Sequence, residues 1–107
     1  MIRANTEAFP NVVVDSWYGL TVDFCQKSGV SVIVKGLRAV TDFDYELQMA
    51  QVNLQAANIE TMFMATAPAH SFLSSSLVKE LAFFGGDVSM MVPPNVLSAF
   101  RMNLKGE

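Results

Sequence analysis

Two cations flanking a glycine are the residues of this sequence whose types and spacing point most directly to chemistry. Lys35 and Arg38 stand on either side of Gly36, directly after the apolar run 31–34, which we expect to form a buried strand. They are the only Lys or Arg residues across positions 28–78. In an open parallel sheet, ligands bind beyond the carboxyl ends of the strands, where a glycine lets the backbone approach and helix N-termini offer free amide donors. The group therefore predicts a phosphate-binding corner.

A run of three serines, Ser74-Ser75-Ser76, is the second such group, and it opens a predicted helix. Their hydroxyls and the free amides of the helix start suit a triphosphate, because the helix dipole also favours negative charge there. An N-cap alone explains one serine but not three. For Lys35 and Arg38, the alternative to a phosphate-binding site is a basic turn that is exposed to solvent.

The elements that must position these groups alternate between strands and helices. We expect strands over residues 11–15, 31–35 and 60–66, and helices over residues 19–28, 41–57 and 74–84, with a last helix beginning at Pro93 or Pro94. Thr41 is the expected N-cap of the second helix, with Asp44 as its capping-box partner. Short βα units of this kind predict right-handed crossovers and a parallel sheet, so the fold class is α/β.

The helix expected over residues 41–57 carries two stripes. The polar stripe is Asp42, Glu46 and Asn53, and the apolar stripe is Phe43, Leu47, Ala50 and Leu54. The polar stripe can face a ligand, while a solvated helix surface is the alternative for its carboxylates.

Composition limits the class of protein. At 107 residues with 51% hydrophobic residues, the chain is expected to form a single domain over residues 1–107. A net charge of -3 argues against a nucleic-acid or anionic-membrane partner. Cys25 is the only cysteine, which excludes an internal disulfide and favours a buried structural residue. We find no signal peptide and no apolar run long enough to span a membrane, and we expect a cytoplasmic location.

Two longer motifs carry a family resemblance. They are residues 34–50, VKGLRAVTDFDYELQMA, and residues 71–80, SFLSSSLVKE. The chain resembles bacterial phosphopantetheine adenylyltransferases from about Phe9 to Phe100, including Gly86-Asp87-Val88. The resemblance implies a Rossmann-like nucleotidyltransferase fold that transfers AMP from ATP to 4'-phosphopantetheine, giving dephospho-CoA and pyrophosphate in coenzyme A biosynthesis. It also implies Mg²⁺ accompanying ATP and a homohexamer.

The same resemblance implies roles for individual residues. The residues implied to bind ATP are Gly36, Leu37, Arg38, Glu46, His70, Ser71, Phe72, Leu73, Ser74, Ser75 and Ser76. Thr21 and Lys35 are implied to bind the substrate, although ordinary packing is an equal alternative for Thr21. The family often has Arg where Lys35 stands, and lysine keeps the charge without the planar fork. His70 is expected to be a flat stacking or loop residue, and no residue is expected to hold a metal.

One departure from the family concerns catalysis. The Thr-x-Gly-His helix start and the substrate lysine that follows it have no counterpart, since the only histidine is His70 and no Gly-His pair occurs. Residues 1–8 read as the back half of a helix without a cap. We therefore expect the first βα units of the fold to be missing, Met1 to be an internal methionine, and no catalytic residue to be present.

Three hypotheses follow. The chain is an adenylyltransferase that retains much of its ATP site and part of its substrate site, with negligible turnover alone. Alternatively it is a non-catalytic ATP-binding or oligomerisation module, or an incomplete remnant whose exposed strand edges invite aggregation.

Overall fold

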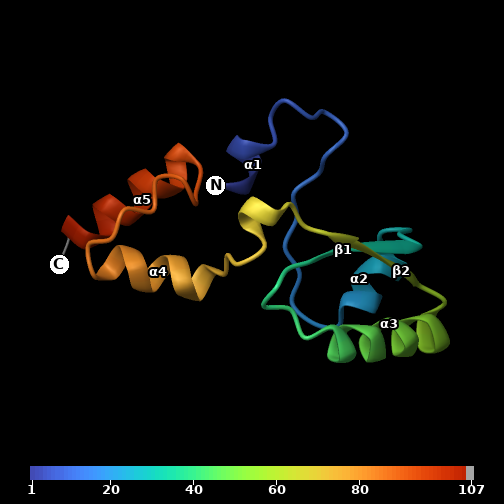
Figure 1. The fold of residues 1–107 in the computed structure, drawn as a ribbon. Helices are drawn as coiled ribbons and strands as arrows, with labels where there is room; N and C mark the ends of the chain where they lie inside the picture. The colour runs from blue at the N-terminus through green and yellow to red at the C-terminus, as the bar shows by residue number, and fades with distance from the viewer. Residues whose placement is uncertain (106–107) are drawn as a thin grey trace. The chain divides into compact units, whose positions relative to one another are not determined.

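The computed structural model describes residues 1–105, and Gly106 and Glu107 lie outside the described residues. Figure 1 shows the elements along the chain. In order, these are α1 (Ile2–Asn5), α2 (Thr21–Lys27), β1 (Val32–Leu37), α3 (Phe43–Ala57), β2 (Glu60–Ala65), the 3₁₀ helix η1 (Pro68–His70), α4 (Ser75–Phe83) and α5 (Pro94–Lys105). They fall into two compact units, Ser16–Phe72 and a second made of Met1–Asp15 with the residues from Leu73 on. The single domain over residues 1–107 stays a prediction.

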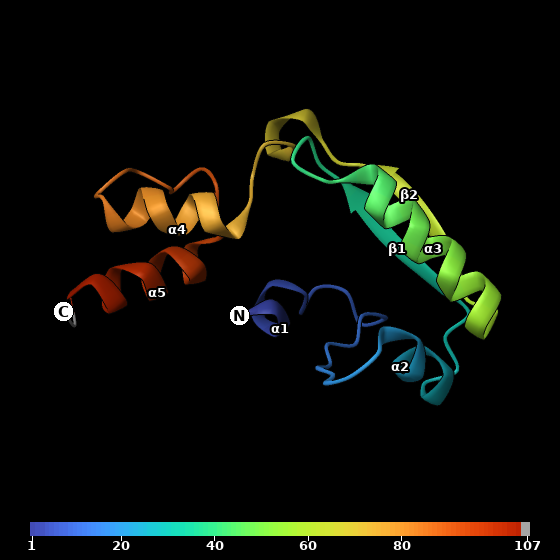
Figure 2. The same ribbon diagram turned by 90° about the horizontal axis from the view of Figure 1, so that it is seen from below.

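The unit Ser16–Phe72 is built on a two-stranded parallel sheet. β1 pairs with β2 in a register that sets Val32 opposite Glu60 and Leu37 opposite Ala65. α3 connects the two strands and lies along the sheet, as Figure 2 shows. The predicted α/β class with a parallel sheet is therefore confirmed.

The two faces of this sheet differ. Lys35 and Phe63 are opposite each other in the register and point toward α3, where they contact Glu46 and Phe43. On the other face, Val34 is 61% exposed, and the large apolar side chains of Val32, Met62 and Met64 are exposed as well. α3 thus covers one face of the sheet.

α3 turns part of its polar stripe toward the sheet. Asn53 is buried and Glu46 is half-buried against Lys35, whereas Leu47 and Leu54 stay substantially exposed. The face that α3 turns to the sheet is therefore mixed: Glu46 and Asn53 of the polar stripe lie there together with Phe43 and the half-buried Ala50 of the apolar stripe. This orientation brings a carboxylate to the sheet.

The N-cap of α3 is Asp42, so the prediction of Thr41 was wrong. The Asp42 Oδ1 accepts a hydrogen bond from the Tyr45 backbone N–H at 3.2 Å. Thr41 instead accepts one from the backbone N–H of Arg38, at 3.0 Å to its Oγ1. A carboxylate at the cap also carries the negative charge that a helix start favours, which explains why the aspartate displaces the threonine.

Loss of this cap should destabilise the unit modestly. We expect Asp42→Ala to lower the free energy of unfolding by about 1 kcal/mol, the usual cost of removing a capping side chain. Urea denaturation followed by circular dichroism measures the change. Asp44→Ala, a matched removal of an exposed carboxylate in the first turn of α3, should cost clearly less; equal losses would show that the cap has no special role.

The strand predicted over residues 11–15 is wrong, because the structure has no strand there. Three consecutive valines favour extended backbone, but a strand also needs a partner that supplies hydrogen bonds. This segment has turn and irregular structure, and the side chain of Arg3 donates to the carbonyl of Val14 at 3.5 Å. β propensity without a pairing strand does not form a sheet.

The second unit has its core between α4 and α5, which lie side by side in Figures 1 and 2. Val78, Ala82 and Val88 are buried there, with Leu97 and Phe100 of α5 packed against them. Gly85 has a φ of 81° just after α4, the left-handed conformation expected of a glycine that ends a helix. α5 begins at Pro94, within the predicted choice.

Candidate functional site

The candidate site lies where β1 and β2 end, because the loops that follow both strands are joined there. The backbone N–H of Ala39 donates to the carbonyl of Ser71 at 2.8 Å and to its Oγ at 2.9 Å. The backbone N–H and the hydroxyl of Thr66 both donate to the carbonyl of Leu37, at 3.0 and 2.9 Å. The loops at the carboxyl edge of the sheet are thus held together by hydrogen bonds, and this is the edge at which ligands bind in open parallel sheets.

Lys35 is the charged group of this edge, and it is paired. Its Nζ lies 2.5 Å from Oε2 of Glu46 on α3, with the two side chains 37% and 25% exposed. Arg38, three residues on, is exposed, and a short turn holds its backbone, since Thr41 N–H donates to the Arg38 carbonyl at 3.0 Å. Of the two predicted cations, Lys35 forms an ion pair with α3, and Arg38 lies in the loop after β1.

Gly36 sits between them at a close approach of two segments. A Cβ at this position would lie 3.1 Å from the Cγ2 of Thr66. Any larger residue here requires Thr66 to shift by a few tenths of an ångström. The glycine therefore keeps the two strand ends tightly packed.

The residues predicted after β2 occupy a short turn. His70 ends η1 and is exposed, consistent with the expected loop position, and Phe72 is 48% exposed. Ser71 is half-buried, and its carbonyl oxygen and its Oγ both accept from the backbone N–H of Ala39. Thr21, the other predicted contact in this unit, is the exposed first residue of α2.

The serine run forms the start of α4, as predicted. Ser74 is the N-cap, and its hydroxyl oxygen accepts from the Leu77 backbone N–H at 3.2 Å. Ser75 and Ser76 are exposed in the first turn, while Leu73 is packed against the core of its unit. One serine serves the helix, and two present hydroxyls to solvent.

The predicted ATP residues fall in both units. Gly36, Leu37, Arg38, Glu46, His70, Ser71 and Phe72 belong to Ser16–Phe72, and Leu73, Ser74, Ser75 and Ser76 belong to the other unit. Within Ser16–Phe72, hydrogen bonds from Ala39 to Ser71 join the loop after β1 to the turn after β2. Their joint role in binding ATP stays a prediction.

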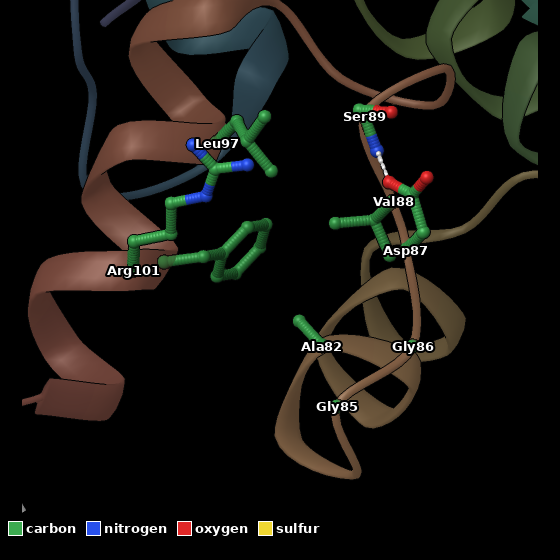
Figure 3. A pocket seen from close by; sticks show the side chains of 9 residues that line it. Ala82, Gly85, Gly86, Asp87, Val88, Ser89, Leu97 and Arg101 are labelled. Atoms are coloured by element: carbon green, nitrogen blue, oxygen red, sulfur yellow. Dashed lines mark hydrogen bonds between the residues drawn. The ribbon is translucent and has the colours of Figure 1, made fainter.

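A groove of about 430 Å³ lies between α5 and the segment after α4, and Figure 3 shows the residues that line it. The backbone N–H of Ser89 donates to Asp87 Oδ1 at 2.9 Å. This bond, helped by the Ser89 side chain and by the charge of Arg101, holds the pKa of Asp87 below its ordinary value of 3.8. Sequence reasoning noted Gly86-Asp87-Val88 only as part of the resemblance and predicted no groove, because the groove depends on how α5 packs.

Across residues 1–105, no three His, Cys, Asp or Glu side chains gather in a way that would hold a metal ion. Within the same described residues, no helix is both long and apolar enough to cross a membrane.

Comparison with known proteins identifies the family. The model of the cytidylyltransferase-like family matches residues 1–81. The chain is 60% identical to a phosphopantetheine adenylyltransferase of Frankia alni over 94% of its own length and 62% of that protein's. It is 56% identical to the protein of the same name from Streptomyces coelicolor, over 98% of this chain and 66% of that protein. It is 58% identical to the one from Frankia casuarinae, over 96% of this chain and 64% of that protein.

These matches confirm the resemblance to phosphopantetheine adenylyltransferases. The chain spans 62–66% of the length of the curated relatives that it matches. With a family match over residues 1–81 and an α/β fold with a parallel sheet, the chain belongs to the cytidylyltransferase-like family.

Proposed function

We propose that this chain carries the nucleotide-binding part of a phosphopantetheine adenylyltransferase, which transfers AMP from ATP to 4'-phosphopantetheine and releases pyrophosphate. The observation that carries this proposal is the identity of 56–60% to proteins of that name along nearly the whole chain. A place in coenzyme A biosynthesis, a cytoplasmic location and a homohexamer belong to the same proposal.

The geometry at the carboxyl edge of the sheet supports phosphate binding. Lys35 supplies a cation for the phosphate of the substrate, and Gly36 allows close approach of the backbone. The exposed Arg38 of this edge suits the polyphosphate of ATP. In the other unit, the exposed hydroxyls of Ser75 and Ser76 at the start of α4 are further donors of the kind that a phosphate accepts from. Each of these groups binds or orients charge, and none is needed as a base.

The reaction itself demands little proton chemistry. The nucleophile is a phosphate oxygen that is already ionised at neutral pH, so positioning and charge stabilisation dominate. A Mg²⁺ ion bound together with ATP would supply positive charge that favours the departure of pyrophosphate. The residues of this chain therefore act by holding two phosphate-bearing ligands in line.

A second candidate is an ATP-binding module without turnover. The observation that favours this candidate concerns histidine. His70 is the only histidine of the sequence, and it lies in the exposed turn after β2 and not in a Gly-His pair at the start of a helix. Such a module binds the nucleotide and lacks the donor that steadies the transition state. A measurable rate of dephospho-CoA formation distinguishes an adenylyltransferase from such a module, which binds ATP without forming product.

Base preference tests the proposed nucleotide directly. The matched family is named for cytidylyl transfer, whereas the relatives are named for adenylyl transfer. We expect Mg·ATP to bind at least tenfold more tightly than Mg·CTP in a competition titration on the purified chain. Equal affinities would remove the adenylyl assignment.

A further inference from the structure

The ion pair between Lys35 and Glu46 joins two residues that the site was expected to use separately. Lys35 was assigned to the substrate and Glu46 to ATP, yet the structure sets Nζ and Oε2 2.5 Å apart. The pair links β1 to α3 across eleven positions of sequence. A phosphate that approaches Lys35 therefore meets an ammonium whose charge is already balanced.

This contact is held in place by neighbouring packing. Phe43 stands three residues before Glu46 on α3, and its ring lies 5.6 Å from that of Phe63 in an edge-on contact. Phe63 is the register partner of Lys35. Because residues three apart share a helix face, the first turn of α3 is fixed on both strands at once, with Glu46 directed at Lys35.

The partial exposure of both side chains limits the strength of the ion pair between Lys35 and Glu46. At 37% and 25% exposed, the pair is not fully screened, but water still weakens it, so about 1 kcal/mol is an upper value for its strength. Converted at 1.4 kcal/mol per tenfold, that is roughly a fivefold change in an equilibrium constant. Any ligand that needs Lys35 has to overcome this factor.

We propose that Glu46 is a positioning residue that holds the Lys35 ammonium in place, and that a phosphate-bearing ligand has to draw Lys35 away from it. The proposal rests on the proposed function only in assigning Lys35 to a phosphate. It makes Glu46 a competitor of the incoming anion. If Glu46 instead contacts the ligand, removing its carboxylate lowers the affinity for that ligand.

The test uses inorganic pyrophosphate, which carries neither a base nor a pantetheine arm. Isothermal titration at low ionic strength compares the full chain with Glu46→Gln, Glu46→Asp and Asp44→Asn, each checked for folding by circular dichroism. Glu46→Gln removes the charge of the pair, and Glu46→Asp keeps the charge but shortens the reach to Lys35. Asp44→Asn makes the same change in net charge at an exposed position of α3.

We expect pyrophosphate to bind about two- to fivefold more tightly to Glu46→Gln and to gain at least part of that in Glu46→Asp, with Asp44→Asn close to the unsubstituted chain. Unchanged or weaker binding by folded Glu46→Gln, equal gains in Asp44→Asn, or no pyrophosphate binding by either chain would overturn the proposal.

The same samples separate this inference from the proposed function. If Glu46→Gln gains affinity for pyrophosphate but no variant binds 4'-phosphopantetheine more tightly than pantetheine, the ion-pair inference stands and the assignment of the substrate fails. If the phosphate of 4'-phosphopantetheine adds affinity but Glu46→Gln gains nothing, the inference fails and the proposed function stands.

Discussion

Lys35→Met should weaken the binding of 4'-phosphopantetheine to this chain by about ten- to a hundredfold. A hydrogen bond to a charged group is worth about 1.5–3 kcal/mol, and the substitution removes the only ammonium at the carboxyl edge of the sheet within residues 28–78. It also leaves Glu46 without its partner across the helix and sheet, which adds repulsion toward the incoming phosphate. Isothermal titration with 4'-phosphopantetheine measures the loss.

Two matched variants define what the loss means. Lys27→Met makes the same charge change at a lysine whose Nζ lies 5.5 Å from the centre of the Trp17 ring, and it should leave this affinity nearly unchanged. Lys35→Arg keeps the charge and offers two donors for a phosphate, so it should retain most of the binding. Equal losses in Lys27→Met and Lys35→Met would mean that net charge, not the position of Lys35, governs the affinity.

The second large effect concerns turnover. These 107 residues on their own should form dephospho-CoA at least about 10²–10³ times more slowly than the Frankia alni phosphopantetheine adenylyltransferase. Removal of one donor that stabilises transition-state charge typically costs that factor, and the chain has no Gly-His pair to provide it. Pyrophosphate release with saturating ATP and 4'-phosphopantetheine is the assay.

Complementation provides the control for this expectation. Adding the part of the Frankia alni protein that lies outside the 62% matched by this chain should raise the rate if the two pieces complete one site. A rate from the chain alone within tenfold of the relative would contradict the account, because His70 or another of its own residues would then have to supply the missing stabilisation.

Helix ends were the most predictable part of the fold. Ser74 caps α4 and Gly85 follows it with a φ of 81°, and both act through local hydrogen bonds or backbone freedom that depend on a few neighbouring residues. The burial of Cys25, at 3% exposed, also follows from its apolar helical surroundings. Local chemistry is sufficient for features of this kind.

Features that depend on distant partners were not predictable to the same degree. The valines at 12–14 have strand propensity, but no pairing strand gives them a ladder in the structure. The N-cap of α3 is a local feature that was nevertheless missed, since Asp42 and Thr41 are adjacent residues that can both cap a helix and sequence patterns locate a helix start only to within one or two residues.

The candidate site shows the same division. A parallel strand ending near Lys35 was predicted from the order of strand, loop and helix, but β1 continues through Gly36 to Leu37. The expectation that this strand is buried was wrong, because Val34 is 61% exposed on the face that α3 does not cover. The pairing of Lys35 with Glu46 was not predicted, because it depends on which face α3 turns to the sheet. Spacing indicated a polar stripe but not its direction.

Titration of the purified chain with Mg·ATP, after a thermal melt has shown cooperative unfolding, tests most directly whether these residues form an adenine-nucleotide site. Saturable binding by a cooperatively folded chain is the predicted result. A chain that melts cooperatively yet gives no saturable heat with ATP would contradict the account, because the family motifs would then be present without the site that they were expected to build.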